Sequence, residues 1–513
     1  MASGTRTKSS IRNSVVGVSA YLLEIFCKFI VRSFFIRIMV SEYWGMDSIF
    51  SNILHFLSLA ELGIGNAVVY SLYKPLSEKN MEKISELMLF FKRAYIVIAI
   101  AVASIGLLIM PFINVIITDA PAISENLYIL YLMYLANSAC SYLLIYRKTL
   151  LVADQKEYKA SLVNMCGVVI CSILQIIVLQ ITKKFIFYLL IQILFTILQN
   201  LVISKICLME YPAIKKSNTQ LPREERRGIL KNVRALSIYK IAVVVVHNTD
   251  NLIISRYVGL IAVGLYSNYY YITAAVYNLI KMALSALTAS IGNLNVEADL
   301  KRKELVYKTV SLIAFWMFSF VAIGFYVMID DVILFWVGAD CMLSRAVVTI
   351  LVINFYLEGI SAIFSIQRGT HGLFVEGQLR PIVSTVVNLI VSLVLVRYIG
   401  MLGVFIGTTV AFLSINVWYD TYIVYKHVFK TNVWKFYFVE IRNTALAVLL
   451  GVLLQALTSA IQFENTILLL LTKFIICTVV VNSVYALLFH KTDEMLYIKK
   501  CLKNIICKKP KKQ

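Results

Sequence analysis

The sequence predicts an all-α membrane protein that crosses the bilayer many times. Of its 513 residues, 60% are hydrophobic and only 15% are charged. The apolar residues recur in separate blocks of about 20, the length that crosses a hydrocarbon core as a helix. A helix makes all its backbone hydrogen bonds internally, as the bilayer interior requires. This composition excludes a water-soluble multidomain enzyme.

About fourteen blocks qualify as spans when the apolar windows are separated at their polar breaks. They cover residues 14–38, 45–70, 92–113, 125–146, 160–180, 185–208, 236–255, 259–293, 309–329, 346–366, 381–397, 401–425, 437–458 and 466–489. The first block contains several charged residues and has no small-residue cleavage site. It therefore reads as a helix of the mature chain rather than as a cleaved signal peptide.

The basic residues predict the orientation of these spans. The chain has 49 Lys and Arg against 28 Asp and Glu, a formal charge of +21, and most of the basic residues fall in alternate connections. Cytoplasmic connections carry the excess of Lys and Arg in multi-pass proteins. Both termini are thus predicted to be cytoplasmic, and the charge reflects membrane topology rather than nucleic-acid binding.

A long polar segment at 209–235 predicts a division of the chain into two bundles. The N-lobe is predicted at 1–208, with the first six spans, and the C-lobe at 236–426, with the next six. Two additional spans follow at 437–489, before a basic cytoplasmic tail at 490–513. A short repeat supports duplication, because Arg256–Val263 (RYVGLIAV) and Arg397–Val404 (RYIGMLGV) both stand at predicted turns between spans. Chance similarity between two apolar segments is the alternative.

Soluble-enzyme motifs are absent from the sequence. There is no Gly-rich phosphate loop with Lys, no His-Glu-x-x-His, and the five His residues show no metal-ligand spacing. We therefore expect no enzyme activity, no metal and no resident cofactor. Energy for any transport must come from an ion gradient, from substrate supply or from a partner.

Charges inside the first span indicate a polar face. Glu24, Lys28 and Arg32 follow at i, i+4 and i+8, within about 80° of one another around the helix. One charge at mid-bilayer costs roughly 2.5–3.5 kcal/mol, so this stripe must face partners or a hydrated cavity. Glu24 and Lys28 can pair, which leaves Arg32 without a partner in its own helix. A salt-bridged packing seam is the alternative to a substrate-binding role.

Lys281 is the second candidate for an anion contact. It stands in the middle of the predicted span 259–293, in a tyrosine-rich segment without an acidic residue within two turns. An ammonium group in a low-dielectric cavity suits a phosphate. The tyrosines themselves are more simply explained as interfacial residues.

Acidic and amide residues within spans, Glu24 among them, are candidates for cation coupling or gating. Asp250 stands in the polar run 247–251 (HNTDN), which offers oxygen ligands to a cation or a proton. Glu61 begins the segment 61–65 (ELGIG), whose glycines permit close helix approach or a bend near the cytoplasmic end. Packing between helices explains both patterns equally well.

Several motifs together resemble a known family. They are 60–67 (AELGIGNA), 71–76 (SLYKPL), 151–156 (LVADQK), 372–374 (GLF), Arg380-Pro381 and Asn388. With them, the whole chain resembles the bacterial polysaccharide flippases of the multidrug/oligosaccharidyl-lipid/polysaccharide exporter superfamily. The first two motifs are the most specific.

The resemblance implies two six-helix lobes in a V around a central cavity, plus two C-terminal helices, in a bacterial plasma (inner) membrane. It implies flipping of an oligosaccharide linked by pyrophosphate to a polyprenol such as undecaprenol, for capsule, O-antigen or another surface polymer. Lys28, Arg32 and Lys281 are then the expected pyrophosphate contacts. Related lipid II flippases bind sodium in the C-terminal lobe, and Asp250, Asn388 and Thr408 stand on similar helices, so sodium or proton coupling is an expectation. Polymerases and glycosyltransferases of the pathway are the expected partners.

Two other functions compete with this one. A multidrug or metabolite exporter of the same superfamily would need acidic contacts for cationic drugs, and the basic residues named above argue against it. An integral-membrane polymerase or glycosyltransferase would need a large external loop or a cytoplasmic domain with carboxylates. No predicted connection is long enough for either.

Overall fold

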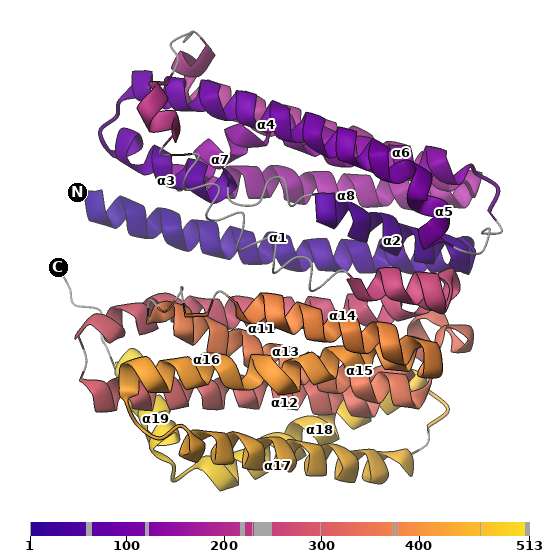
Figure 1. Ribbon diagram of the computed structural model, residues 1–513, viewed down its shortest axis with the longest axis vertical. Helices are drawn as coiled ribbons and strands as arrows, with labels where there is room; N and C mark the ends of the chain where they lie inside the picture. The colour runs from indigo at the N-terminus through magenta and orange to yellow at the C-terminus, as the bar shows by residue number, and fades with distance from the viewer. Residues whose placement is uncertain are drawn as a thin grey trace. The chain divides into compact units, whose positions relative to one another are not determined.

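The structure, a computed structural model, describes residues 2–57, 64–117, 123–215, 221–227, 229, 249–297, 299–371, 373, 376–377, 379–461 and 463–507. Every regular element in this part of the chain is a helix (Figure 1). The chain divides into two compact units, Met1–Gly264 and Leu265–Gln513. The division falls just after the start of helix α11, downstream of the predicted linker at 209–235, much of which lies outside the described residues.

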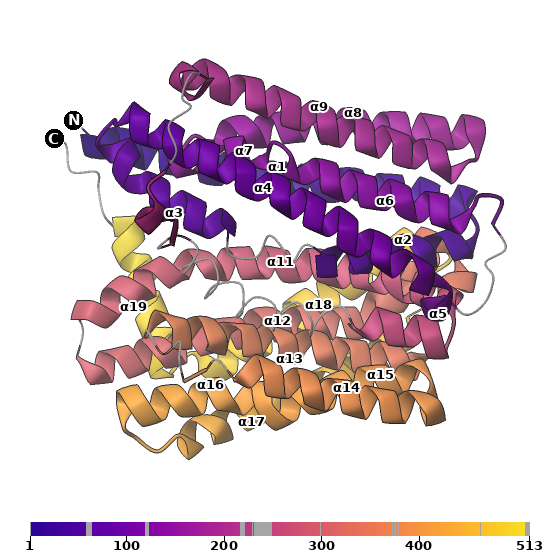
Figure 2. The same cartoon turned by 45° about the horizontal axis from the view of Figure 1, so that its top comes forward.

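Unit 1 is built around four long helices. Its helices are α1 (Ala2–Ile38), α2 (Ser41–Leu57), α3 (Ile64–Ser77), α4 (Met81–Ile109), α5 (Ile113–Ile116), α6 (Leu127–Tyr142), α7 (Ile145–Ala153), α8 (Glu157–Thr182) and α9 (Phe185–Glu210). Helix α1 packs along α8, and α6 packs against both α4 and α9. Figure 2 shows α8 and α9 running side by side as an antiparallel pair.

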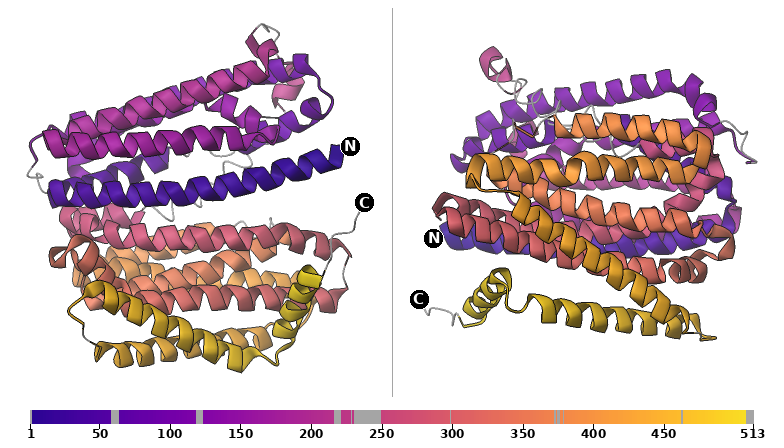
Figure 3. Two further views of the ribbon diagram at one scale, coloured as in Figure 1. Left: turned by 180° about the vertical axis from the view of Figure 1, so that it is seen from behind. Right: turned by 60° about the horizontal axis from the view of Figure 1, so that its bottom comes forward.

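Unit 2 is built around α12, which packs against α13, α17, α18 and α19. The helices are α11 (Leu260–Glu297), α12 (Leu300–Val337), α13 (Arg345–Thr370), α14 (Arg380–Ile399), α15 (Met401–Ala411), α16 (Val417–Val424), α17 (Trp434–Ser459), α18 (Thr466–Phe489) and α19 (Asp493–Cys507). π-Helical turns at Phe412–Asn416 and Tyr425–Phe429 continue α15 and α16 into one long segment. Figure 3 shows α17, α18 and α19 in yellow along one side of this unit.

Nine described helices are long and apolar enough to span a membrane. A tenth span is reached if α6 and α7, which meet at 42°, are counted together. This agrees with a multi-pass membrane protein. The bend was not predicted, because the sequence analysis treated 125–146 as one span. It falls at Leu143–Leu144 and involves no proline or glycine.

The outward-facing side chains of these helices are apolar. Ile181 on α8 and Leu487 on α18 are more than two thirds exposed, and many similar residues on α4, α9 and α17 are also exposed. In water such a surface would drive aggregation, whereas lipid tails solvate it at no cost. The many hydrophobic residues of the sequence thus form the lipid-facing surface as well as the core.

Helix ends are fixed by side-chain caps and by glycines. The side chains of Asn126 and Asn465 accept hydrogen bonds from backbone amides in the first turns of α6 and α18. In the predicted repeat, Gly259 and Gly400 have φ angles of 122° and 58°, in the region that favours glycine. Each of the two repeated segments therefore turns at its glycine into a following helix.

Candidate substrate-binding site

The predicted polar stripe on the first helix is present on α1. The Lys28 ammonium group lies 2.5 Å from a carboxylate oxygen of Glu24, one turn earlier. The Lys28 side chain is 54% exposed and that of Glu24 is 42% exposed. An exposed i, i+4 pair contributes only about 0.3–0.5 kcal/mol to stability. Both charges are therefore accessible to water or to a ligand.

Arg32, one turn further along α1, is buried and has a partner on another helix. Its side chain is only 7% exposed, and its guanidinium lies 3.3 Å from Asp47 Oδ2 on α2. The other Asp47 oxygen accepts a hydrogen bond from the Tyr134 hydroxyl on α6. The guanidinium also lies 5.6 Å from the centre of the Phe35 ring. Asp47 thus balances the Arg32 charge within unit 1.

A role for Asp47 was not predicted from the sequence. A usable signal existed, because α1 ends at Ile38, α2 begins at Ser41, and Arg32 and Asp47 are equally far from this break. Two such residues of a helical hairpin lie at similar depth in a membrane. An arginine and an aspartate at matching depth are natural partners, since each alone would be costly there.

An aromatic cluster in unit 1 surrounds the Arg32–Asp47 pair. The Phe185 ring on α9 lies 5.3 Å from the rings of Phe35 and Tyr43 and 5.5 Å from that of Tyr188. The Tyr43 hydroxyl donates a hydrogen bond to the Glu125 carboxylate, which also accepts one from the Phe185 amide. Rings packed in this way hold α1, α2 and α9 in fixed relation around the ion pair.

Lys281 on α11 belongs to unit 2 and is exposed. Its ammonium group lies 5.8 Å from the centre of the Tyr277 ring. No ion pair joins it to a carboxylate in the part of the chain that the structure describes. An exposed cation–π contact contributes about 0.5–1 kcal/mol, less than the cost of placing the charge in hydrocarbon. Lys281 therefore keeps its charge available to water or to an anion.

Two of the predicted cation-coupling residues lie together between α14 and α15. The buried Asn388 donates a hydrogen bond from Nδ2 to Thr408 Oγ1 over 2.9 Å. Its Oδ1 atom has no hydrogen-bond partner among the described residues. A cation role for this pair stays a prediction, because one amide oxygen and one hydroxyl are fewer ligands than a sodium or calcium ion takes.

The remaining predicted residues are less informative. Asp250 is half-buried at the beginning of a helical segment, while its predicted neighbours His247 and Asn248 lie outside the described residues. Glu61 lies outside them as well. Within the described ranges, no group of three or more His, Cys, Asp or Glu side chains could hold a metal ion.

A second buried ion cluster lies in unit 2, and the sequence did not predict it. Asp420 on α16 is fully buried, and its two oxygens lie 2.8 Å from Arg368 Nε and 2.8 Å from Arg380 Nη1. Arg368 also donates to the Leu373 carbonyl, and Arg380 to Ser361 Oγ over 3.2 Å. One carboxylate therefore holds the ends of α13 and α14 together.

The positive-charge pattern assigned Arg368 and Arg380 to the connection between the predicted spans 346–366 and 381–397, and it did not predict that their side chains are buried. Arg368 is in the last turn of α13, which ends at Thr370, and Arg380 is the first residue of α14. Both side chains are mostly buried. Burial is sustainable because each guanidinium is paired with Asp420. Hydropathy counts treat all basic residues near a span end as solvated, so they miss such a cluster.

Comparison with solved structures gives matches over most of the chain. The lipid II flippase MurJ in an inward-closed conformation aligns with a TM-score of 0.68 and 15% identity, covering 93% of this chain and 99% of that chain. An inward-facing multidrug resistance MATE family transporter of the MOP superfamily aligns with a TM-score of 0.63 and 16% identity, covering 83% and 99%. The chain therefore shares the fold of these two proteins.

Other comparisons agree with that conclusion. A mutant of the Vibrio cholerae MATE transporter VcmN aligns with a TM-score of 0.56 and 14% identity over 83% of this chain and 99% of its own. No protein-family model matches the sequence, and no curated protein matches it. The similar structures are a flippase and exporters rather than enzymes, and at these identities the likeness concerns the fold alone.

Proposed function

We propose that this protein is a flippase for polyprenyl-pyrophosphate-linked oligosaccharide repeat units. It moves them by alternating access from the cytoplasmic to the outer leaflet of a bacterial plasma membrane, for assembly of a surface polysaccharide. The observation that carries the proposal is the exposure of two ammonium groups, Lys28 and Lys281, within the long helices α1 and α11. A charge facing hydrocarbon costs roughly 2.5–3.5 kcal/mol, so each of these groups is suited to a hydrated environment and an anionic partner.

The chemistry of such a substrate explains why cations are needed there. Sugars and two phosphates cannot cross about 30 Å of hydrocarbon without polar partners, while the polyprenyl tail stays in lipid. Lysine ammonium groups form charge-assisted hydrogen bonds to phosphate oxygens. The Tyr277 ring beside Lys281 offers an apolar face to a sugar.

In the proposed mechanism, Arg32 exchanges its partner Asp47 for the pyrophosphate of the substrate. Its contact with Asp47 is 3.3 Å long, at the weak end for a charge-assisted bond, and the Asp47 side chain is 33% exposed. A pyrophosphate that reaches Asp47 from the Lys28 side competes for the guanidinium. When the pyrophosphate leaves, the Arg32–Asp47 pair forms again, so the buried arginine never remains without an anion.

The comparisons favour a flippase in one respect. The flippase structure covers 93% of this chain and the MATE transporter covers 83%. The difference, a tenth of the chain, is close to the combined length of α17 and α18, which have 26 and 24 residues. Two helices more than the MATE transporter has would suit a protein that must accommodate a lipid-linked substrate.

A multidrug or metabolite exporter is the second candidate. The partly exposed Asp47 carboxylate favours it, because an acidic group in a transport helix can bind a cationic drug. A flippase and an exporter can be distinguished by the molecule that they transport. A strain that lacks this protein accumulates lipid-linked oligosaccharide on the inner leaflet in the first case, and retains cationic drugs in the second.

The experiment uses a depletion strain complemented with variants. We expect Lys281→Ala to remain in the membrane at normal levels yet to cause inner-leaflet accumulation of lipid-linked oligosaccharide and loss of surface polymer. Lys426→Ala is the matched control, because Lys426 also lies over a tyrosine ring, that of Tyr422, at 5.6 Å but near the end of its helix. Normal export by Lys281→Ala, or drug retention without lipid accumulation, would refute the flippase proposal.

Orientation and energy coupling complete the proposal. We place both termini in the cytoplasm and couple transport to a sodium or proton gradient through Asp250, Glu61 and the Asn388–Thr408 pair. A cysteine introduced at Asn218 in the predicted linker should be labelled by a membrane-impermeant reagent only in inverted vesicles. Labelling in intact cells would contradict this orientation.

A further inference from the structure

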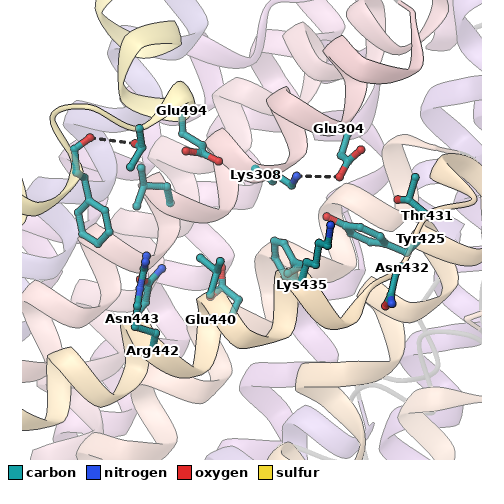
Figure 4. A pocket seen from close by; sticks show the side chains of 15 residues that line it. Glu304, Lys308, Tyr425, Thr431, Asn432, Lys435, Glu440, Arg442, Asn443 and Glu494 are labelled. Carbon is teal, nitrogen blue, oxygen red and sulfur yellow. Dashed lines mark hydrogen bonds and ion pairs between the residues drawn. The ribbon is translucent and has the colours of Figure 1, made fainter.

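A pocket in unit 2 that several charged residues line is used by none of the steps above. It has a volume of about 410 Å³ and lies where α12 and α17 begin and α18 ends, beside α19 (Figure 4). Its charged lining residues are Glu304, Lys308, Lys435, Glu440, Arg442 and Glu494. Such a pocket at the ends of membrane helices is in the zone where lipid head groups lie.

The most unusual group in this pocket is the carboxylate of Glu440. The residue is 8% exposed, and in Figure 4 its side chain points from α17 into the space in front of α12 and α19. The carboxylate makes no hydrogen bond or ion pair with the residues that the structure describes. An ionised carboxylate buried without a partner costs several kcal/mol. A carboxyl group in this position takes up a proton unless a cation accompanies it, so the pocket offers a site where a cation from outside the chain can pair with Glu440.

A second buried polar group, the Tyr425 hydroxyl, also lines the pocket. The Tyr425 side chain is almost completely buried, and its hydroxyl has no hydrogen-bond partner of good geometry in the described part of the chain. Buried hydroxyls nearly always find a partner in protein or ordered water. The Tyr425 hydroxyl, which lies near the Glu304 carboxylate, and the Glu440 carboxylate thus both border this cavity.

Positive charges flank the acidic centre. Lys435 and Arg442 are exposed residues of α17 on either side of Glu440, and the Arg442 guanidinium donates to Asn443 Oδ1 over 3.0 Å. Lys308 is already paired, 2.8 Å from Glu304. The pocket thus presents one buried negative group between two available positive groups. This arrangement is complementary to a ligand that carries a positive and a negative charge a few bonds apart.

We propose that this pocket binds the head group of phosphatidylethanolamine, a phospholipid with a primary ammonium group and a phosphate. The ammonium group donates hydrogen bonds to Glu440, and the phosphate accepts them from Lys435 and Arg442. The neighbouring Trp434 and Phe438 are 64% and 69% exposed, as expected for residues that contact lipid. The acyl chains would lie over this face of α17. The inference does not rest on which substrate the protein transports.

The test measures lipid binding to the purified full-length protein in detergent, by native mass spectrometry and by thermal stabilisation. Phosphatidylethanolamine, phosphatidylcholine and phosphatidylglycerol with identical acyl chains are compared. One charge-assisted hydrogen bond to a buried carboxylate corresponds to an affinity difference of at least about tenfold. We expect phosphatidylethanolamine to bind at least about tenfold more tightly than either other lipid.

Substitutions assign the preference to this pocket. Glu440→Gln should bind the three lipids equally, while Glu464→Gln, at an exposed residue between α17 and α18, should keep the preference. A Lys435→Gln/Arg442→Gln double variant should bind all three lipids more weakly. Equal binding of the three lipids to the wild type, or a preference that survives Glu440→Gln, would overturn the proposal.

A ligand series keeps the test decisive if Glu440→Gln does not fold. Successive N-methylation of phosphatidylethanolamine removes N–H donors without changing the phosphate, and affinity should fall at each step. Binding that is indifferent to methylation would refute recognition by Glu440. Soluble phosphoethanolamine should compete only weakly, and competition at concentrations equal to those of the lipid would show that a free zwitterion, not a lipid, is the ligand.

Discussion

Arg32 on α1 and Asp47 on α2 form an ion pair in which the arginine is buried and the aspartate is one third exposed. The asymmetry gives the pair two uses. It neutralises the Arg32 guanidinium, which could not remain alone inside the membrane. It also leaves part of the Asp47 carboxylate accessible to a ligand that approaches α1. The neighbouring Glu24–Lys28 pair, in contrast, is exposed on both sides.

Removal of the Asp47 charge should destabilise unit 1. In Asp47→Asn, Arg32 keeps at most a neutral acceptor, and the loss of a hydrogen bond to a charged group corresponds to about 1.5–3 kcal/mol. Glu24→Gln removes an exposed pair and should cost less than about 0.5 kcal/mol. Thermal unfolding of the purified variants in one detergent measures both. Equal melting temperatures for the two would show that burial of Arg32 is unimportant.

The Asp420 cluster predicts a larger effect in unit 2. Asp420→Asn leaves Arg368 and Arg380 buried without a counter-charge, which typically costs about 3–5 kcal/mol. Asp340→Asn, at an exposed residue near the start of α13, should leave the melting temperature unchanged. A small effect of Asp420→Asn would mean that water or other groups already satisfy the two arginines.

The sequence predicted helix positions well because the extent of an apolar block in the sequence gives the extent of the helix directly. The span predicted at 466–489 coincides with α18, and that at 381–397 lies within α14. Hydropathy does not report which way a helix is rotated. The partners of Arg32, Arg368 and Arg380 were therefore missed, although each partner is an aspartate visible in the sequence.

The candidate site was predicted only in part for the same reason. The pairing of Glu24 with Lys28 was predicted because both residues are on one helix, where spacing fixes the geometry. The contact between Asn388 and Thr408 joins two helices, and the two residues had been grouped only by resemblance. The roles of all these residues in transport remain predictions.

Glycines at the α14–α15 crossing predict a packing defect on substitution. A Cβ atom at Gly407 would lie 2.8 Å from the Ser392 backbone nitrogen and 3.1 Å from the Asn388 carbonyl oxygen, so the two helices would have to separate. Gly407→Ala should cost about 1–3 kcal/mol. In Gly324→Ala the added Cβ would meet only the Met328 side chain, at 3.7 Å. A Gly407→Ala protein as stable as Gly324→Ala would contradict the close crossing.

His371 predicts a pH dependence of stability. Burial lowers its pKa below the ordinary value of 6.5, helped by the positive charge of Lys303 and opposed by a hydrogen bond to the Gln367 carbonyl oxygen. That bond uses Nδ1, and Nε2 has no partner among the described residues. Below about pH 6.5 the unfolded chain binds the proton more readily, so stability falls as pH falls.

The comparison that isolates this effect is between wild type and His371→Gln. Between about pH 7.5 and 5.5, the wild type should lose more thermal stability than the variant, because only the wild type must keep an imidazole neutral on folding. Parallel pH profiles for the two proteins would show that His371 does not contribute.

The most direct measurement of the central claim is the affinity of the purified protein for a polyprenyl-pyrophosphate-linked sugar. Loss of one charge-assisted contact to phosphate should weaken binding at least about tenfold in Lys281→Ala, whereas Lys426→Ala should bind as the wild type does. If Lys281→Ala binds this lipid as tightly as the wild type and Lys426→Ala, the assignment of Lys281 to the pyrophosphate is wrong.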